Sequence, residues 1–414
     1  MRMRWVIVSL LFFATTINYL DRAILGVILP EIRDKFHFGL PFYGLIQMFF
    51  QIAYAAGSLL GGYLLDRLGT RVGYGVAATL WSLAATLNAF AGSGFQFLAY
   101  RTVLGLGESA NFPACSKAAA EWFPPDERAT AMGIVNAGTN LANIFGPPLF
   151  ITIALTLGWQ ACFAMMGGLG FLWLPFWFLT YRLPKRVERA TAPAGKLSIG
   201  DVLKYKQAWG YGLAKFLTDP VWWFYLFWLP TYLTDVRHFT PAQRGTALMI
   251  VYGISAVGAL LGGVVSSFLM KLGWTVGKAR KMTLLFCAIV MPACTLGVVV
   301  RDARLAVLLF GLATAAHQAW MTNLFIMPAD VFPSGAVGSA NGFGVCLGGL
   351  GGALFSGIIP GTVIPHVGYV PVLMGMSGFY IVAWFIIHRL MGDLGMVTLE
   401  IGESHPESYA PSRA

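Results

Sequence analysis

The chain has 414 residues, of which 57% are hydrophobic and only 11% are charged. An ordinary soluble domain carries about 25% charged residues, so this composition excludes a soluble globular protein. The net charge of +10 would favour a nucleic-acid partner in a soluble protein, but here the basic residues separate long apolar stretches, and we expect a lipid bilayer and no nucleic acid.

Apolar stretches of about 20 residues, the length that a helix needs to cross a bilayer, recur along the chain. The first could be mistaken for a signal peptide, but it contains Asp21 and Arg22, is too long and lacks a small-residue cleavage site, so we interpret it as a retained helix. Breaks at charged residues, Pro and Gly predict an all-α membrane protein with twelve spans, at 5–29, 41–65, 72–92, 95–119, 129–150, 158–182, 209–234, 243–269, 282–300, 303–329, 335–360 and 367–391.

The basic residues are distributed unequally between the two sides of these spans. With both termini placed inside, the inner segments hold 19 Lys and Arg and the outer loops hold 6. This positive-inside pattern predicts an even number of crossings and cytoplasmic termini. We expect a six-helix bundle over 1–182, a cytoplasmic linker over 183–207, a second six-helix bundle over 208–391 and a cytoplasmic tail over 392–414.

The two bundles repeat weakly in sequence, most clearly at glycines. At an offset of 201 residues Gly44 aligns with Gly245, Gly57 with Gly258, and the Leu-Leu-Gly-Gly run at 59–62 with the same run at 260–263. Parallel repeats with a substrate held between them are an architecture of alternating-access transporters, so the repeat favours a transporter over a membrane enzyme. The five cysteines fall in predicted spans without metal-ligand spacing, and we expect no disulfide framework, metal site or cofactor.

The loop between the second and third spans reads GYLLDRLGTR and resembles the G-x-L-x-D-R-x-G-x-R/K signature of the major facilitator superfamily. Gly62 would permit close helix approach, Asp66 would accept hydrogen bonds from a facing helix end, and Gly69 would permit a tight turn. Together with Arg67 these residues predict a conformational latch; the alternative is a solvated turn that carries inside charges. The equivalent loop of the second bundle has Ser267 in place of the aspartate, so a latch would be asymmetric.

Charged residues inside the first and fourth spans predict a buried polar site. Asp21 and Arg22 are neighbours on one helix and should address different partners, unless they form an internal pair that only fixes packing. The guanidinium fork suits a carboxylate, and an isolated Asp in a partly dry cavity can exchange a proton. Arg101 and Glu108 lie seven residues apart on about the same helix face and form either a proton relay or a structural network.

Four runs of residues resemble the anion:cation symporter family of this superfamily, which includes bacterial hexuronate and galactonate transporters. They are Asn-Tyr-Leu-Asp-Arg at 18–22, the segment from Arg101 through Glu108 to Asn-Phe-Pro at 111–113, the tryptophans and Trp-Leu-Pro at 222–230, and His-Gln-Ala-Trp at 317–320 through Asn323 to Asp330. The resemblance implies a major facilitator fold, with Arg22 holding the substrate carboxylate, Asp21 and Glu108 with Arg101 coupling protons, and Tyr19, Tyr54, His317, Trp320 and Asn341 lining the site.

Two departures and several alternatives stay open. His317 stands where galactonate-type members carry a hydroxyl residue, and the fifth span does not decide between Thr139 and Asn140. Without the resemblance, His317 is equally a packing residue, and the tryptophans of the seventh span are interface anchors or lipid-facing bulk. The polar neighbours of Trp320 favour a wet cavity instead. Lys215 and Asp219, one helical turn apart, can neutralise each other.

The sequence therefore predicts a monomeric carrier of the bacterial inner membrane that moves a sugar acid anion, a hexuronate or an aldonate, together with protons. The alternatives are an exchanger or a symporter of another organic anion, such as a dicarboxylate or an aromatic acid, and a transporter-like sensor. The sequence contains no H-E-x-x-H, G-x-S-x-G or phosphate-binding loop, so we expect no enzyme.

Overall fold

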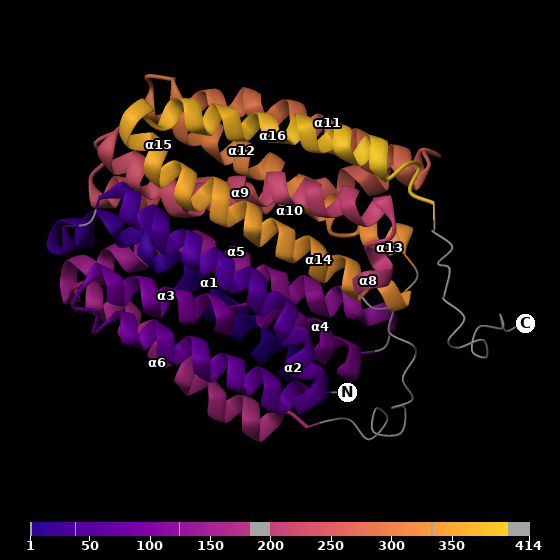
Figure 1. Cartoon of the computed structure of the whole chain (residues 1–414), viewed down its shortest axis with the longest axis horizontal. Helices are drawn as coiled ribbons and strands as arrows, with labels where there is room; N and C mark the ends of the chain where they lie inside the picture. Colours follow the sequence, from indigo (N-terminus) through magenta and orange to yellow (C-terminus); the bar gives the residue numbers. More distant parts are fainter. Residues whose placement is uncertain (1, 38, 124, 183–198, 333, 396–414) are drawn as a thin grey trace, which may run out of the picture.

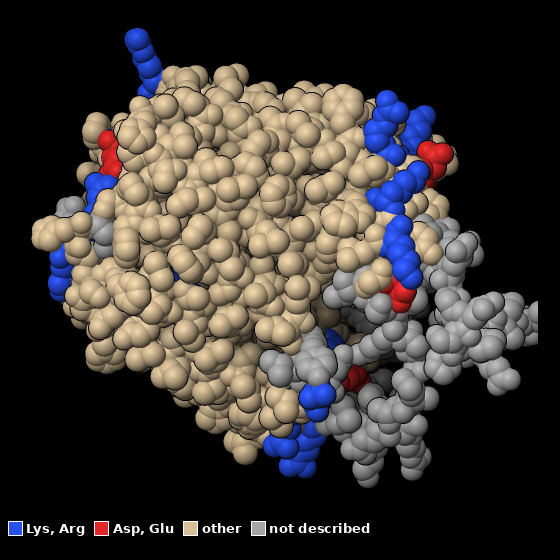
Figure 2. Space-filling view, in the orientation of Figure 1, with Lys and Arg blue, Asp and Glu red and all other residues tan. Residues whose placement is uncertain are grey.

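The computed structural model describes residues 2–37, 39–123, 125–182, 199–332 and 334–395, and within these ranges the chain is helical and contains no strand. Nine helical segments in the described ranges are long and apolar enough to cross a membrane. Figure 2 shows a broad face almost free of Lys, Arg, Asp and Glu, with the charged side chains gathered at its two ends. This distribution suits a molecule whose middle faces lipid.

The helices form two groups that lie side by side in Figure 1. The first group comprises α1 (Arg2–Phe36), α2 (Leu40–Asn88), α3 (Gly94–Glu108), α4 (Asn111–Trp122), α5 (Pro125–Leu157) and α6 (Trp159–Thr180). The second comprises α8 (Ile199–Val202), α9 (Lys206–Asp235), α10 (Pro241–Lys271), α11 (Val276–Thr295), α12 (Ala303–Leu324), α13 (Met327–Val331), α14 (Ser334–Gly352), α15 (Ile359–Val367) and α16 (Tyr369–Leu390), with short turns at Leu296–Val298 and Ala353–Ile358. We call these groups the first and second halves.

Every predicted span lies on helical structure, but several boundaries differ. The spans 41–65 and 72–92 belong to α2, which breaks at Gly69, where φ is 73° and ψ is 159°. Gly69 thus forms a kink, and glycine suits it because a positive φ strains any residue with a Cβ. The span 95–119 is divided between α3 and α4. The predicted linker and tail fall largely on 183–198 and 396–414, outside the described residues.

The first helix is longer than predicted. The sequence prediction ended at residue 29 because Pro30 follows, yet α1 continues through Pro30 to Phe36. Proline removes one hydrogen-bond donor but does not always end a helix, and in membrane helices such a loss is recovered by neighbouring groups. The extension carries Glu31 and Arg33, which contact the second half.

The sequence repeat has a structural counterpart. A Cβ added to Gly44 of α2 would lie 2.7 Å from the carbonyl oxygen of Gly357 in the other half, and a Cβ added to Gly245 of α10 would lie 3.3 Å from the Cα of Pro148 in the other half. The aligned residues Gly44 and Gly245 thus both allow close contact between the halves. Small residues at such positions are what lets membrane helices approach each other closely.

Two ion pairs join the halves at one end of the bundle, and we call them the inter-half ion pairs. Arg33 of α1 binds both carboxylate oxygens of Asp235 at the end of α9, with distances of 2.6 and 2.8 Å. Arg244, near the start of α10, pairs with Glu31 of α1 and also donates to the hydroxyl of Thr234 at 2.8 Å. The halves are therefore held together by charge as well as by close packing at this end.

At the opposite end of the bundle, two ion pairs of the described residues each join helices of the same half. Arg4 of α1 binds Glu127 of α5 at 2.9 Å, and Arg280 of α11 binds Asp330 of α13 at 2.5 Å. In Figure 2 the surface is recessed between the halves at this end, to the right of the view.

Candidate functional site

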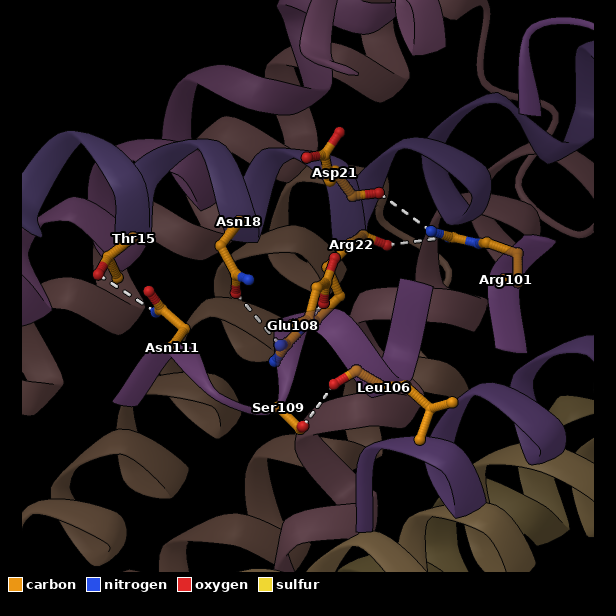
Figure 3. Close-up of polar contacts among 9 residues, drawn as sticks. All are labelled: Thr15, Asn18, Asp21, Arg22, Arg101, Leu106, Glu108, Ser109 and Asn111. Carbon is orange, nitrogen blue, oxygen red and sulfur yellow. Dashed lines mark hydrogen bonds and ion pairs between the residues drawn. The ribbon is translucent and has the colours of Figure 1, made fainter. Parts of the chain in front are cut away.

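Arg22 lies at the centre of the candidate site, buried in the middle of α1. Its Nε atom donates to Oε2 of Glu108 at 2.8 Å, and its Nη2 atom donates to the side-chain oxygen of Asn18 at 3.3 Å (Figure 3). Both members of this ion pair are 1% exposed or less. The Nη1 atom of Arg22 and the Oε1 atom of Glu108 have no hydrogen-bond partner in the part of the chain that the structure describes. The Nη1 atom of the guanidinium is therefore left over for an anion.

Aromatic rings from both halves surround the guanidinium of Arg22. Its Cζ atom lies 4.7 Å from the ring centres of Tyr19 and Tyr54 and 4.9 Å from that of Trp223. Cations are attracted to aromatic faces at such distances. Since Tyr19 and Tyr54 belong to the first half and Trp223 to α9 of the second, Arg22 lies where the halves meet.

Glu108 ends α3 at a break that close packing holds in position. A Cβ added to the preceding Gly107 would lie 2.8 Å from the backbone nitrogen of Trp81 in α2, so only glycine permits this approach. Beyond the break, Asn111 begins α4 and donates to Thr15 of α1 at 3.2 Å, while its side-chain oxygen accepts from Tyr74 at 2.5 Å. The carboxylate of Glu108 is thereby directed at α1.

The charge pairing differs from the one expected for Arg101 and Glu108. Arg101 donates to the backbone carbonyl oxygens of Asp21 and Arg22, at 3.0 and 3.1 Å, and Glu108 pairs with Arg22 instead (Figure 3). A spacing of seven residues predicts that two side chains lie on the same face of a helix. Their partners depend on the neighbouring helix against which that face packs.

Asp21 is set apart from this network. It is 1% exposed, and neither carboxylate oxygen has a hydrogen-bond partner within the described ranges. In Figure 3 its carboxyl group points away from Arg22 and Glu108. Asp21 and Arg22 therefore form no ion pair with each other, and only Arg22 has a charged partner, Glu108.

The predicted residues of the second half bind within that half. His317 of α12 stacks on Trp222 of α9, with ring centres 5.3 Å apart, and contacts the hydroxyl group of Tyr380. Trp320 packs edge-on against Tyr380 at 5.2 Å. The side-chain oxygen of Asn341 accepts from the hydroxyl of Tyr211 at 2.9 Å.

Neighbouring tryptophans of α9 connect these residues to Arg22. Trp222 contacts His317 in the second half, and Trp223 covers Arg22 at the interface. Sequence reasoning named both tryptophans in the family-like run but did not include Trp223 among the site residues. The signal was the pair of adjacent bulky aromatics, whose side chains must point to different neighbours on a helix.

The predicted latch is described only in part. Gly69 forms the break in α2, and the segment around it is tied to other helices of the first half, where Lys117 donates to the carbonyl of Leu65 at 2.6 Å and Arg71 to that of Phe178 at 2.6 Å. Arg67 is exposed. The packing of Gly62 and the side chain of Asp66 lie outside the described residues.

The expected neutralisation of Lys215 by Asp219 is confirmed. Their side chains form an ion pair of 2.8 Å along α9, and both are largely buried. Lys215 also lies 4.2 Å from the ring centre of Phe325. This pair belongs to the second half and is separate from the ion pair between Arg22 and Glu108.

Comparisons with known proteins also indicate a membrane transporter. A family model described as Major Facilitator Superfamily matches residues 11–356. The chain is 27% identical to a hexuronate transporter of Escherichia coli (strain K12), over 99% of this chain and 98% of that protein. It is 28% identical to a D-galactonate transporter of Escherichia coli O6:H1, over 96% and 97%. A solved bacterial homologue of the human lysosomal transporter Spinster shares the fold, with a TM-score of 0.75 and 18% identity over 94% of this chain and 98% of that one.

Proposed function

Because the chain belongs to the Major Facilitator Superfamily, whose members are membrane transporters and not enzymes, we propose that it carries a sugar acid anion together with protons across the bacterial inner membrane. The observation that carries this proposal is Arg22, a buried guanidinium whose Nη1 atom has no partner in the described structure and which is lined by aromatic rings from both halves. A guanidinium binds a carboxylate through paired hydrogen bonds, and an aromatic face suits the C–H groups of a polyhydroxylated chain or ring. The names of the relatives, hexuronate and galactonate transporters, support this substrate class.

Proton coupling follows from competition for Arg22. Glu108 holds Nε of Arg22 at 2.8 Å, so an incoming carboxylate and Glu108 are rival partners for one cation. A proton on Glu108 removes its negative charge and leaves Arg22 to the substrate. Asp21, with two unpartnered oxygens, is a second group that can take up a proton. The proposed coupling residues are therefore Glu108 and Asp21, and Arg101 orients the backbone of α1 that carries Asp21 and Arg22.

The way the halves meet supports alternating access. We propose twelve crossings in two six-helix bundles with cytoplasmic termini, which puts the inter-half ion pairs at the outer end. The close packing of Gly26 on Leu226, where an added Cβ would lie 2.9 Å from the carbonyl oxygen, closes the same side. Such a state is closed to the outside and recessed on the cytoplasmic side. The latch around Asp66 stays a prediction for the opposite, outward-facing state.

The inter-half ion pairs should set the balance between the two states. Exposed ion pairs contribute about 0.2–1 kcal/mol each, so Arg33→Asp, which also repels Asp235, should shift the population toward the outward-facing state several-fold. The measurement is the distance between spin labels at Lys35 and Ala242, which are exposed at the outer ends of α1 and α10. Four of the five native cysteines are buried, so background labelling should be low.

A charge exchange and a matched control test this assignment. Arg33→Asp combined with Asp235→Arg should restore the distance distribution of the parent protein. Arg4→Asp breaks a pair of similar exposure within the first half and should leave the distribution unchanged. An unchanged distribution in Arg33→Asp, or a shift of the same size in Arg4→Asp, would show that these pairs do not hold the outer side closed.

Transport itself is tested with purified protein in proteoliposomes. Labelled galacturonate, glucuronate and galactonate should accumulate when the outside is acidic and the pH gradient is intact. Accumulation should vanish when the gradient is collapsed. Uptake that needs internal substrate and ignores the gradient would identify an exchanger, and binding without uptake would identify a sensor. Uptake of dicarboxylates or aromatic acids alone would overturn the sugar acid assignment.

A further inference from the structure

Gln51 of α2 is an amide for which the described structure gives no partner. Its side chain is fully buried, and neither its oxygen nor its nitrogen is hydrogen-bonded within the described residues. A buried unpaired amide costs free energy that an apolar side chain of the same size would not cost. A buried amide of this kind is explained if it forms a hydrogen bond in another state of the protein.

The position of Gln51 indicates what that partner is. A Cβ added to Gly352 of the second half would lie 2.9 Å from Nε2 of Gln51 and 3.2 Å from Cδ1 of Trp223, so the amide lies beside the pyrrole edge of this indole. The same indole covers Arg22, at 4.9 Å from its Cζ atom. Tyr54, which also lines Arg22, follows Gln51 by about one turn of α2.

We propose that Gln51 recognises a hydroxyl group of the substrate and so selects hydroxylated acids over other carboxylates. This inference rests on the proposed function, because it takes Arg22 as the carboxylate anchor. With the carboxylate on Arg22, the C–H face of the substrate packs on Trp223 and a hydroxyl group reaches the Gln51 amide, which can donate and accept.

The contact between the halves explains why the amide is covered here. Gln51 packs against Gly352, and a Cβ on Gly349 would lie 3.4 Å from the Gln51 carbonyl oxygen, so α2 and α14 are in close contact at this point. Parting of these helices as the halves move uncovers the amide next to Trp223. Once the helices part, the absence of side chains at Gly349 and Gly352 leaves room for a hydroxyl group beside the amide.

The test pairs a change in the protein with a change in the ligand. Binding constants are measured for the parent protein and Gln51→Leu, with one sugar acid and each of its monodeoxy analogues. Loss of a hydroxyl that a buried amide recognises should weaken binding to the parent about tenfold or more. For the analogue that lacks the hydroxyl group recognised by Gln51, Gln51→Leu should bind the sugar acid and the analogue with equal affinity. The difference between the two affinity ratios then measures the contact between Gln51 and that hydroxyl group.

Gln47→Leu is the matched control. Gln47 lies one turn earlier on α2 and is also fully buried, with its amide at hydrogen-bond distance from the side chain of Tyr43. In Gln47→Leu, the ratio of the affinity for the sugar acid to that for each monodeoxy analogue should stay within twofold of the ratio in the parent protein. Because Gln51 makes no side-chain hydrogen bond in the described structure, its replacement removes none, and the thermal midpoint of Gln51→Leu should equal or exceed that of the parent.

Two outcomes would overturn the proposal. Either no position shows a ratio that depends on Gln51, or Gln47→Leu changes the same ratio as strongly as Gln51→Leu does. Failure of the proposed function is distinguishable from both, since the parent protein would then bind no sugar acid in the first measurement.

Discussion

Replacement of Arg22 by Lys is expected to weaken sugar acid binding by about tenfold or more. Lysine keeps the positive charge but is a point donor, and it cannot present two parallel N–H groups to one carboxylate while it also holds Glu108. The smaller head group also loses stacking on Tyr19, Tyr54 and Trp223, which lie 4.7 to 4.9 Å from the guanidinium carbon. The measurement is equilibrium binding by calorimetry in detergent, with uptake in proteoliposomes as a second readout.

Lysine is the informative replacement because it does not leave Glu108 without a cation. Removal of one member of a buried ion pair costs about 3–5 kcal/mol, so Arg22→Ala combines a folding defect with a binding defect. Arg237→Lys is a suitable control, since Arg237 donates to Tyr232 and to the carbonyl of Gly297 away from the candidate site. Near-normal affinity in both Arg22→Lys and Arg22→Ala would contradict the assignment of Arg22 as carboxylate anchor.

Glu108→Gln is expected to abolish accumulation driven by a pH gradient while substrate binding persists. Glutamine resembles the protonated form of Glu108, removes the rival charge from Arg22 and cannot cycle between charged and neutral forms. The variant should therefore bind substrate at least as well as the parent and exchange it across the membrane without a gradient. Paired uptake and counterflow assays in proteoliposomes measure the two activities separately.

Glu127→Gln provides the matched comparison for Glu108→Gln. Glu127 pairs with Arg4 at the far end of the first half and is 33% exposed, so its neutralisation should leave coupling intact. If Glu108→Gln still accumulates substrate uphill on a proton gradient, Glu108 is not essential for coupling and that role falls to Asp21 alone.

The helical segments were predictable because long apolar runs and positive charges follow from the cost of burying polar backbone and charge in lipid. The kink at Gly69 was predictable for a comparable reason, since local backbone geometry depends on the residue itself. The continuation of α1 past Pro30 was not predictable in this way. Its reason lies in Asp235 and Arg244 of the second half, which bind Arg33 and Glu31.

The candidate site shows the same limit. Burial cost identified Asp21, Arg22, Arg101 and Glu108 as special, because charges inside a membrane span are expensive. Spacing along one helix did not reveal that Glu108 faces Arg22, since that depends on how α3 packs on α1. Gln51 was missed because an amide in an apolar span is a weaker signal than a charge, and its lack of a partner is visible only in three dimensions.

The glycine contacts between the halves have a kinetic consequence. Where Gly44 meets Gly357 and Gly361, backbone lies against backbone, so no side-chain rotamer has to change for the helices to part at this point. The neighbouring Tyr43 differs, because its ring packs on Trp228 at 5.0 Å and its hydroxyl donates to the carbonyl oxygen of Phe227, and both contacts break when the halves part. In the proposed alternating-access cycle, the barrier to separation would be set by the aromatic contacts and ion pairs that cross between the halves, and the glycine contacts would add little to it.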